Sequence, residues 1–335
     1  MTRIPGHYVS VHIYYNADDL RPVLLDCVAP LVEELSRASL ISRFFFIRYW
    51  EGGAHVRLRL LLANDRDTSL VTEKAGAAVT KFLHEQPSLL DPDPTILGPV
   101  MRRLYIMEYG EQSYVNRFGE SGIPLRKNNS FSFETYAQEL NRYGGVEGMD
   151  LAERHFWNSS ECVLSVLAEH NRRLRPYILG AAFQFMLHFA HAFLGDMRDL
   201  SAFFQRYNQI FSNLVASSDV ELRFRPLYEQ QKSRLMERIS ELEELTQVLL
   251  VTDVGPLARL VQLAPRLGED VARLDRCGKL SFEQLSVTGR DVKYRLLANY
   301  LHMSNNRLGV RIAEEMYIAY MIAAALNGEP MISPV

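Results

Sequence analysis

Residues 43–62 constrain the fold more than any other part of the chain. The run from Arg43 to Trp50 is strongly aromatic, and the run from Ala54 to Leu62 begins with a strict alternation of apolar and polar residues. Both patterns are typical of β-strands. The segment Glu51-Gly52-Gly53 between them supplies a tight turn. This part of the sequence therefore predicts an antiparallel hairpin.

The second strand of this hairpin places cations on one face. Because side chains of a strand alternate between its faces, His55, Arg57 and Arg59 share one side, and Val56 and Leu58 share the other. Two arginines two residues apart form a rigid fork that suits carboxylates. A solvated outer face of the hairpin is the alternative. The stretch alone leaves both interpretations open.

The flanking segments indicate the sheet to which the hairpin belongs. The run His7 to Tyr15 alternates as a strand, whereas Asp18 to Ala38 and Thr68 to Glu85 have helical apolar spacing. The order β-α-β-β-α is that of a split βαβ, ferredoxin-like lobe. Such a lobe needs one more strand, which we place in the region Arg102 to Tyr109. We expect the segment 86–100, with its Asp-Pro-Asp-Pro run, to form a loop.

The chain changes character near residue 150. The segment 110–135 is polar and rich in Gly and Asn, and it includes Arg117, so we interpret it as an ordered binding loop or a partly mobile loop. Helical patterns then follow one another at 151–170, 174–195, 198–215, 223–250, 255–274 and 290–326. We therefore predict an α+β protein, with a sheet lobe over 1–150 and a helical lobe over 151–335.

Composition excludes several classes of protein. The net charge of −3 argues against a nucleic-acid binder. No run of about 18 apolar residues predicts a membrane span, and no charged-then-apolar leader marks secretion, so we expect a cytoplasmic protein. Cys27, Cys162 and Cys277 lack metal or disulfide spacing and are expected to be reduced thiols.

No sequence motif indicates a metal or an organic cofactor. His188 and His191 form an HxxH pair on a very apolar stretch, but a metal site needs more ligands. We interpret the pair as core or interface histidines. The apolar segment 181–195 suits the core or a homodimer interface equally well.

A second polar segment runs from Tyr136 to Gly145. Glu139 and Arg142 stand three residues apart, which lets them pair on a helical turn. Gly144 and Gly145 permit a sharp turn or the close approach of a ligand to the backbone. The simpler alternative is a surface ion pair followed by a helix C-cap.

A third polar segment begins the last predicted helix. At helical spacing, Leu297, Leu301 and Leu308 face the core, and a polar stripe lies on another face. His302 lies in that stripe, where the flanking asparagines can fix its tautomer. A structural or exposed histidine is the alternative. The stripe comprises Arg295, Asn299, His302 and Asn306.

Together these segments resemble a known family. The string 45–60, the block from Tyr136 to Gly145 and the block from His302 to Leu308 resemble the thiopeptide-type bacteriocin biosynthesis family, as do Val11 to Tyr15 and Phe156 with Ser159. That family contains the C-terminal, glutamate-eliminating domain of class I lantibiotic dehydratases and its stand-alone relatives. This chain is too short to include the large glutamylating domain, so we expect a stand-alone member.

The resemblance implies a lyase of antibiotic peptide biosynthesis that needs no metal or cofactor. In such systems a separate transferase uses glutamyl-tRNA to glutamylate Ser or Thr of a ribosomal precursor peptide. The elimination domain then expels glutamate and leaves dehydroalanine or dehydrobutyrine. The catalytic residues carried over by the resemblance are Arg57, Arg59, Glu139, Arg142 and His302. We add as substrate-binding candidates His55, Arg48, Asn299, Asn306 and Arg117.

Two other functions stay open. A pyridine synthase of the same family performs a formal [4+2] cyclisation of two dehydroalanines and releases the leader peptide. Alternatively, the protein is an inactive partner that only binds the precursor peptide. The sequence departs from the family at Ala54, where proline is usual, at Asn158, where aspartate is usual, and at Ala137-Gln138 before Glu139. None of these departures touches the five proposed catalytic residues.

Overall fold

The computed structural model describes residues 7–169, 174–212, 217–253, 255–283 and 289–328. The chain divides into two compact units, Met1–Ala137 and Gln138–Val335. The first is α+β and the second is helical, which confirms the predicted fold class. The division falls thirteen residues before the predicted boundary at 150, so Glu139 and Arg142 belong to the helical unit.

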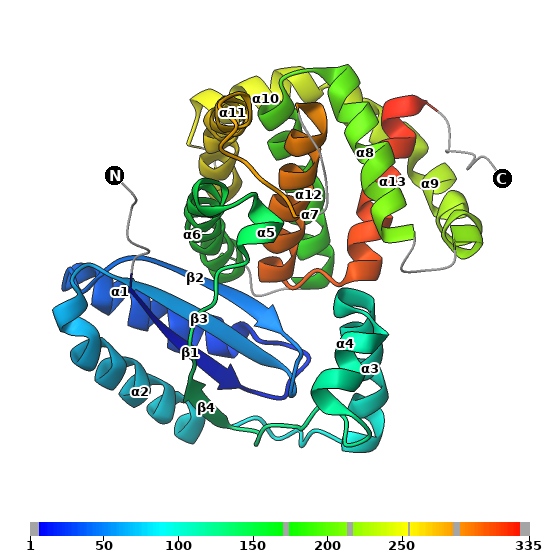
Figure 1. The fold of residues 1–335 in the computed structure, drawn as a ribbon. Coiled ribbons are helices and arrows are strands. Elements are labelled where there is room, and N and C mark those ends of the chain that lie inside the picture. The colour runs from blue at the N-terminus through cyan, green and yellow to red at the C-terminus, as the bar shows by residue number, and fades with distance from the viewer. Residues whose placement is uncertain (1–6, 170–173, 213–216, 254, 284–288, 329–335) are drawn as a thin grey trace. The chain divides into compact units, whose positions relative to one another are not determined.

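The first unit is built on a four-stranded antiparallel sheet (Figure 1). Its strands lie in the order β2-β3-β1-β4, which is the order of a ferredoxin-like split βαβ lobe. Neighbouring strands are antiparallel throughout. The strands are β1 (Tyr8–Tyr14), β2 (Ile41–Tyr49), β3 (His55–Leu62) and β4 (Ser130–Phe133).

Two helical segments cover one face of this sheet (Figure 1). The first is α1 (Ala29–Arg37), which continues a π-helical segment (Val23–Val28), and the second is α2 (Thr68–Glu85), preceded by a short 3-10 turn (Asp65–Asp67). The apolar side chains of β1, β2 and β3 alternate onto this face and are fully buried there; examples are Val11, Phe46, Val56 and Leu58. Burial of this apolar face fixes the register of the sheet.

The fourth strand is Ser130–Phe133, and its predicted position at Arg102 to Tyr109 was wrong. That region lies in α3 (Pro94–Tyr109), whose first turn is capped by the Asp93 side chain. Met101 and Tyr105, one helical turn apart, are buried in a small apolar cluster. The helical period and the cap therefore outweigh the strand-like composition.

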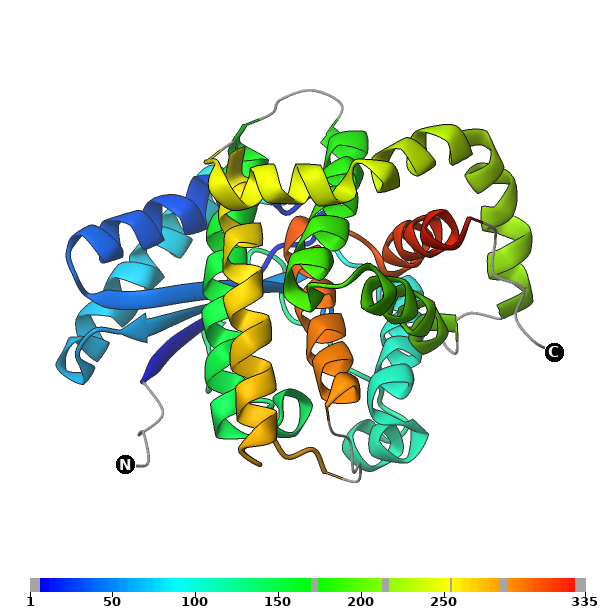
Figure 2. The same cartoon turned by 90° about the horizontal axis from the view of Figure 1, so that it is seen from above.

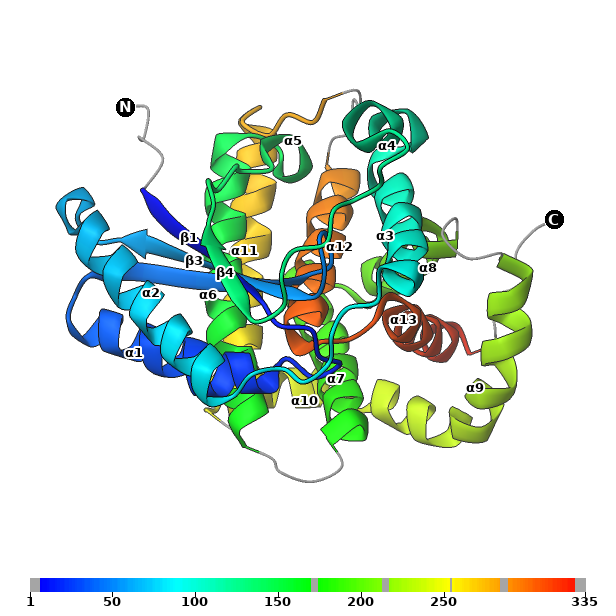
Figure 3. The same ribbon diagram turned by 90° about the horizontal axis from the view of Figure 1, so that it is seen from below.

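The segment predicted to be an irregular loop contains a second helix, α4 (Glu111–Phe118). It lies beside α3 (Figure 3) and contributes Tyr114 to the same apolar cluster. Within the predicted loop, residue 110, residues 119–129 and residues 134–135 lack helix or strand structure.

The helical unit is organised around four packed helices. Figure 2 shows α11 (gold) beside α6 (green), with α7 and α12 (orange) next to them. Helix α13 packs against α7, α8 and α9. The helices of this unit are α5 (Leu140–Tyr143), α6 (Val146–Ala168), α7 (Leu174–Leu194), α8 (Met197–Ser212), α9 (Ser217–Ser240), α10 (Leu242–Val251), α11 (Gly255–Arg276), α12 (Arg290–Leu308) and α13 (Ile312–Asn327).

The predicted helical segments are confirmed with two corrections. The stretch 223–250 is two helices, α9 and α10, and the stretch 290–326 is also two, α12 and α13. Gly309 ends α12 in the left-handed conformation, and at the start of α13 the Glu314 carboxylate accepts from the backbone N–H of Arg311. Residues 170 and 213–215 of the predicted helices lie outside the described residues.

Helix α7 is long and apolar enough to span a membrane, although the sequence analysis predicted no span. Its window Arg175–Leu194 is 67% buried within the structure. Phe185, Phe189 and Ala190 are fully buried, so most of this helix serves as core. The three cysteines are free, as predicted, and two of them are buried.

The packing of α7 and α11 generates a stability prediction. A Cβ atom on Gly268 would lie 2.3 Å from the Phe193 carbonyl oxygen, whereas a Cβ on Gly180 would meet nothing within 4 Å. We expect Gly268→Ala to destabilise the protein by about 1–3 kcal/mol, because the two backbones must separate. Gly180→Ala should stabilise it by about 0.4–1 kcal/mol through helix propensity. Urea denaturation of the two variants checks this, and equal effects would contradict the packing described here.

A buried histidine generates a second prediction. His155 of α6 packs against Phe189 and Tyr300, and its Nε2 lies 3.0 Å from the Ser304 hydroxyl. Burial, reinforced by the nearby charge of Arg307, lowers its pKa to about 3. Because the unfolded chain takes up this proton at a higher pH, the stability that neutral His155 provides is complete above the unfolded pKa and is lost as the pH falls towards 3.

In the unfolded chain the pKa of a histidine is about 6.5. The difference between the two pKa values implies that the free energy of unfolding falls by about 2 kcal/mol from pH 7 to pH 5 because of His155 alone. We expect His155→Gln to flatten this pH dependence by that amount, whatever its effect at pH 7. The exposed His84, replaced as His84→Gln, is the matched control and should leave the slope unchanged. Urea midpoints at both pH values measure the effect, and an unaltered slope in His155→Gln would contradict it.

Candidate functional site

The sheet presents a polar face on the side opposite α1 and α2. In the register of the strands, Arg57 pairs with His12 and Arg59 with Ser10, while His55 pairs with Tyr14. These side chains therefore lie on one surface, which we call the arginine face. His55, Arg57 and Arg59 share it, in agreement with the alternation of the sequence.

His55 is a neutral hydrogen-bonding link on the arginine face. Its Nδ1 donates to the Gly53 carbonyl at 2.8 Å, and its Nε2 accepts from Nε of Arg57 at 3.0 Å. Burial and the charges of Arg57 and Arg59 lower its pKa to about 3, against the opposing effect of the Gly53 bond. The positive charge of this face is therefore carried by the arginines, whose orientation His55 helps to fix.

His12 is a second neutral histidine that the sequence analysis missed. Its ring stacks on that of His55 with centroids 5.3 Å apart. Burial and the neighbouring Arg57 lower its pKa to about 3. Its alternation within β1 was visible in the sequence, but only the pairing of β1 with β3 places it opposite Arg57.

Aromatic rings support both arginines. The guanidinium carbon of Arg57 lies 3.5 Å from the centroid of the Tyr49 ring. That of Arg59 lies 4.6 Å from the Tyr136 ring and 5.5 Å from the Phe45 ring. Stacking restricts the rotamers of these long side chains without neutralising their charge. The arginine face is therefore prepared to bind an anion.

Glu51 connects two of the predicted residues. Its carboxylate lies 3.9 Å from a terminal nitrogen of Arg57 and 2.9 Å from one of Arg117. Arg117, at the end of α4, is thus brought to the hairpin turn. Arg48 does not lie on the arginine face. It pairs in register with Val56, so it lies on the helix-covered side of the sheet, where its charge helps to lower the pKa of Asp19.

The second cluster lies in the helical unit, where α5 meets α12. Arg142 pairs with Glu139 at 3.2 Å, as their spacing predicts. Its Nε donates to Oδ1 of Asn299 at 3.4 Å, and Nδ2 of Asn299 donates to the Arg142 carbonyl at 3.3 Å. The Arg142 guanidinium is therefore held from two sides and remains 35% exposed.

Three glycines allow α5 to lie against the start of α6. Gly144 and Gly145 have positive φ angles of 82° and 92°, as a sharp turn requires. A Cβ atom on Gly148 would lie 1.8 Å from the carbonyl oxygen of Tyr143. A side chain at Gly148 would push the backbone of Tyr143 away from α6, so this glycine allows the close approach that positions the neighbouring Arg142.

His302 on α12 lies within hydrogen-bonding distance of a buried carboxylate on α13. Its Nδ1 lies 3.0 Å from Oε2 of Glu315, which is 1% exposed, while His302 is 25% exposed. The other Glu315 oxygen accepts from the Tyr207 hydroxyl. Burial would raise the pKa of Glu315, but its interactions with His302, Tyr207 and Asn305 hold that pKa below its usual range. Glu315 is therefore an anion that orients His302 through Nδ1.

Glu315 and Tyr207 were not predicted, because they come from other helices and share no motif with His302. The remaining predicted residue, Asn306, follows His302 by one helical turn and is half-buried. In the described residues, His, Cys, Asp and Glu form no group of three that could hold a metal ion. His188 and His191 are buried, and both lie within hydrogen-bonding distance of the Thr246 hydroxyl, at 2.9 and 3.2 Å.

Comparisons with solved structures agree with this fold. The pyridine synthase TbtD from thiomuracin biosynthesis superposes with a TM-score of 0.76 at 20% identity, covering 96% of this chain and 98% of that one. TsrL superposes with a TM-score of 0.64 at 18% identity, covering 97% and 95%. The tRNA-dependent lantibiotic dehydratase MibB from Microbispora sp. 107891 gives a TM-score of 0.59 at 17% identity, covering 98% of this chain but 29% of its own.

No curated protein matches the sequence. The profile of the family described as lantibiotic biosynthesis dehydratase C-term matches residues 9–326, nearly the whole chain. The match includes the strands of the arginine face, the Glu139–Arg142 turn and the two helices that carry His302 and Glu315. The protein therefore belongs to the lantibiotic dehydratase C-terminal family.

Proposed function

We propose that the protein eliminates glutamate from glutamylated Ser or Thr in a ribosomally made precursor peptide, leaving dehydroalanine or dehydrobutyrine. The observation that carries this proposal is the pairing of His302 with the buried anion Glu315. A histidine held by a carboxylate through one nitrogen is suited to move a proton with the other.

His302 is assigned to the proton of the reaction. When Nδ1 donates to Glu315, Nε2 is the basic nitrogen of the neutral ring. It removes the α-proton of the glutamylated residue as the Cα=Cβ bond forms and the Cβ–O bond breaks. Glutamate departs as a carboxylate. Glu315 stabilises the imidazolium that results.

The arginines are assigned to the negative charges. Arg57 and Arg59 hold the carboxylates of the glutamyl group, since guanidinium groups bind carboxylates through paired donors. Arg142, oriented by Glu139 and Asn299, stabilises the enolate or the departing carboxylate. Fixed cations suit this step because the α-proton of a peptide is a weak acid.

Further predicted residues receive supporting roles. His55 orients Arg57, Arg117 acts through Glu51 at the hairpin, and Asn299 and Asn306 flank His302 on α12. Arg48 is left out because it lies on the other side of the sheet. The proposed partners are the precursor peptide and a separate glutamyl-tRNA-dependent transferase in the cytoplasm.

A second candidate function is pyridine formation by cyclisation of two dehydroalanines. It is favoured by one observation: the pyridine synthase TbtD matches this fold almost end to end, with a higher TM-score than the dehydratase MibB. Cyclisation has no glutamate to bind, so it gives Arg57 and Arg59 no evident role. We therefore rank elimination first.

The first test follows the elimination step itself. Purified protein incubated with a synthetic peptide that carries one glutamylated serine should release glutamic acid, detected by mass spectrometry. Replacing Arg57 or Arg59 by alanine should slow this release by about 10²–10³-fold, as loss of a fixed charge-stabilising donor does in other enzymes. The exposed Arg37, replaced as Arg37→Ala, is the control and should act as the wild type.

The same experiment separates the alternatives. Ring formation and leader release from a peptide with two dehydroalanines, without glutamate release from the first peptide, would establish the pyridine synthase instead. If neither peptide gives a product, even after addition of the transferase, the remaining interpretation is an inactive partner that only binds the precursor peptide.

The second test concerns Glu315, a positioning residue that acts through His302. Glu315→Gln preserves the size of the side chain and removes its charge, so we expect kcat for glutamate release to fall by about 10²-fold or more. The KM for the glutamylated peptide should change little, because Glu315 does not contact substrate.

Glu314→Gln is the matched control for Glu315→Gln. It makes the same change one residue earlier, where the carboxylate pairs with Arg175. Its kcat should stay at the wild-type value, although its thermal stability falls somewhat. Equal loss of kcat in both variants would show that Glu315 is only structural.

A further inference from the structure

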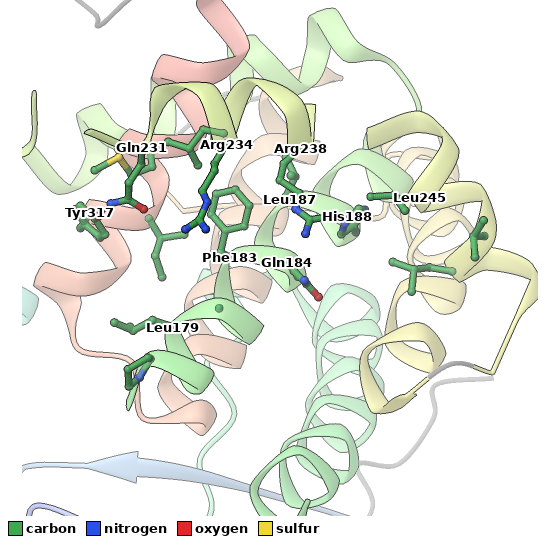
Figure 4. A pocket seen from close by; sticks show the side chains of 17 residues that line it. Leu179, Phe183, Gln184, Leu187, His188, Gln231, Arg234, Arg238, Leu245 and Tyr317 are labelled. Carbon is green, nitrogen blue, oxygen red and sulfur yellow. Dashed lines mark hydrogen bonds between the residues drawn. The ribbon is translucent and has the colours of Figure 1, made fainter. Parts of the chain in front are cut away.

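A pocket in the helical unit takes no part in the proposed chemistry. It lies among α7, α9, α10 and α13, has a volume of about 740 Å³ and is lined largely by apolar side chains, as Figure 4 shows for Leu179, Phe183 and Leu245. None of the proposed catalytic residues lines it. In the sheet unit, the carboxylate of Glu51 has no part in that chemistry either, although it lies beside Arg57.

Glu51 places a negative charge between two of the arginines. One carboxylate oxygen lies 2.9 Å from a terminal nitrogen of Arg117, and the other lies 3.9 Å from a terminal nitrogen of Arg57. The first distance is that of a charge-assisted hydrogen bond, whereas the second is an ion pair without a hydrogen bond. The Glu51 side chain is only 17% exposed. Its charge therefore acts on Arg57 with less screening than the charge of a surface carboxylate.

The hairpin turn fixes the position of Glu51. Positive φ angles at Gly52 and Gly53, of 79° and 111°, close the turn directly after it. The Arg126 amide donates to the Gly52 carbonyl at 2.8 Å, which ties the turn to the segment before β4. The Glu51 carboxylate is therefore held beside Arg57.

Arg57 keeps donors for a second carboxylate. Among the described residues, its one hydrogen bond runs from Nε to His55, and its guanidinium group stacks on the Tyr49 ring. The terminal nitrogens therefore have N–H groups that Glu51, at 3.9 Å, does not bind. A ligand carboxylate on these groups comes close to Glu51, and two like charges at short range disfavour one another.

Elimination changes the charge of the group that the arginine face is proposed to bind. A glutamyl ester has one carboxylate and one ammonium group, so its net charge is zero while the amine is protonated. When the Cβ–O bond breaks, its electron pair stays on the departing oxygen and the α-proton passes to His302. Free glutamate then has two carboxylates, one ammonium group and a net charge of −1. A fixed negative charge beside the binding arginine thus destabilises the bound product more than the bound substrate.

We propose that Glu51 makes the arginine face prefer the neutral glutamyl ester over free glutamate, and so expels the product after elimination. This inference rests on the proposed function, because glutamate is the product named there. Arg117 has a part in the balance: its pairing with Glu51 limits the repulsion, so that the single carboxylate of the substrate still binds Arg57. Glu51 is then a specificity-determining residue that acts through its charge and does not touch the reacting atoms.

Two small ligands test this preference without any turnover. L-Glutamate carries the charge of the product, and its α-methyl ester carries the charge of the glutamyl group in the substrate. Isothermal titration calorimetry at pH 6, where both ammonium groups are protonated, gives the affinity of each ligand for the intact wild-type protein and for Glu51→Gln. We expect the variant to bind glutamate about tenfold more tightly and the methyl ester at most about threefold more tightly. The ratio of the two affinities therefore changes.

Three further variants separate a charge effect from structural damage. Glu51→Asp keeps the charge and should keep most of the wild-type preference. Glu111→Gln is the matched control, because it removes a carboxylate that pairs with Arg102 at the opposite end of α4. It should leave both affinities at the wild-type values. Arg57→Ala should weaken the binding of both ligands, which would locate them on the arginine face.

An unchanged affinity ratio in Glu51→Gln would overturn the proposal, as would the absence of glutamate binding to both proteins. Product inhibition gives a second measurement: added glutamate should inhibit glutamate release by Glu51→Gln at about a tenfold lower concentration than in the wild type. If glutamate is released from the glutamylated peptide but the ratio does not change, the proposed function stands and Glu51 has no such role. If the ratio changes but no glutamate is released, the proposed function is refuted and the charge preference of the arginine face stands.

Discussion

The two-residue alternation of β3 is the constraint on which the sheet unit depends. Val56, Leu58 and Leu60 are fully buried on the side that carries α1 and α2, and Arg57 and Arg59 lie on the other. A shift of register by one residue would place two guanidinium groups in the apolar core, at a cost of several kcal/mol per charge. The hydrophobic core therefore determines where the cations lie, and no separate interaction is needed to direct them.

The two clusters use opposite electrostatic devices. On the arginine face, burial keeps His12 and His55 neutral, so neither ring adds to the charge, and His55 positions Arg57 through a hydrogen bond. In the helical unit, Glu315 is more deeply buried but keeps its charge, because three groups hydrogen-bond or pair with it. Binding an anion requires fixed cations, whereas moving a proton requires a base with an adjacent anion. The environments of the two clusters match these requirements.

The sequence predicted the parts of the structure that local periodicity determines. The hairpin, the helix Thr68–Glu85 and the pairing of Glu139 with Arg142 all follow from residue spacing within one element. The strand β4 was missed because four residues are too few to show a period, and α3 was misassigned because its aromatic composition resembles a strand.

The residues missed at the candidate site are long-range partners. Glu315 and Tyr207 reach one another across 108 positions of sequence, and His12 meets Arg57 only through the pairing of two strands. No spacing within a helix or strand encodes such contacts. The predicted catalytic residues came from local blocks of sequence, whereas the groups that orient them, such as Asn299 for Arg142, depend on tertiary packing.

Helix α13 connects the chemistry of the helical unit with its pocket. Glu315 holds His302 from this helix, and Ile318 and Met321, one and two turns further on, line the pocket. Most residues of α13 are buried, so the position of this helix is determined by the side chains that pack around it. The orientation of His302 therefore depends on the packing of α13 against α7, α8 and α9, which holds Glu315 in place.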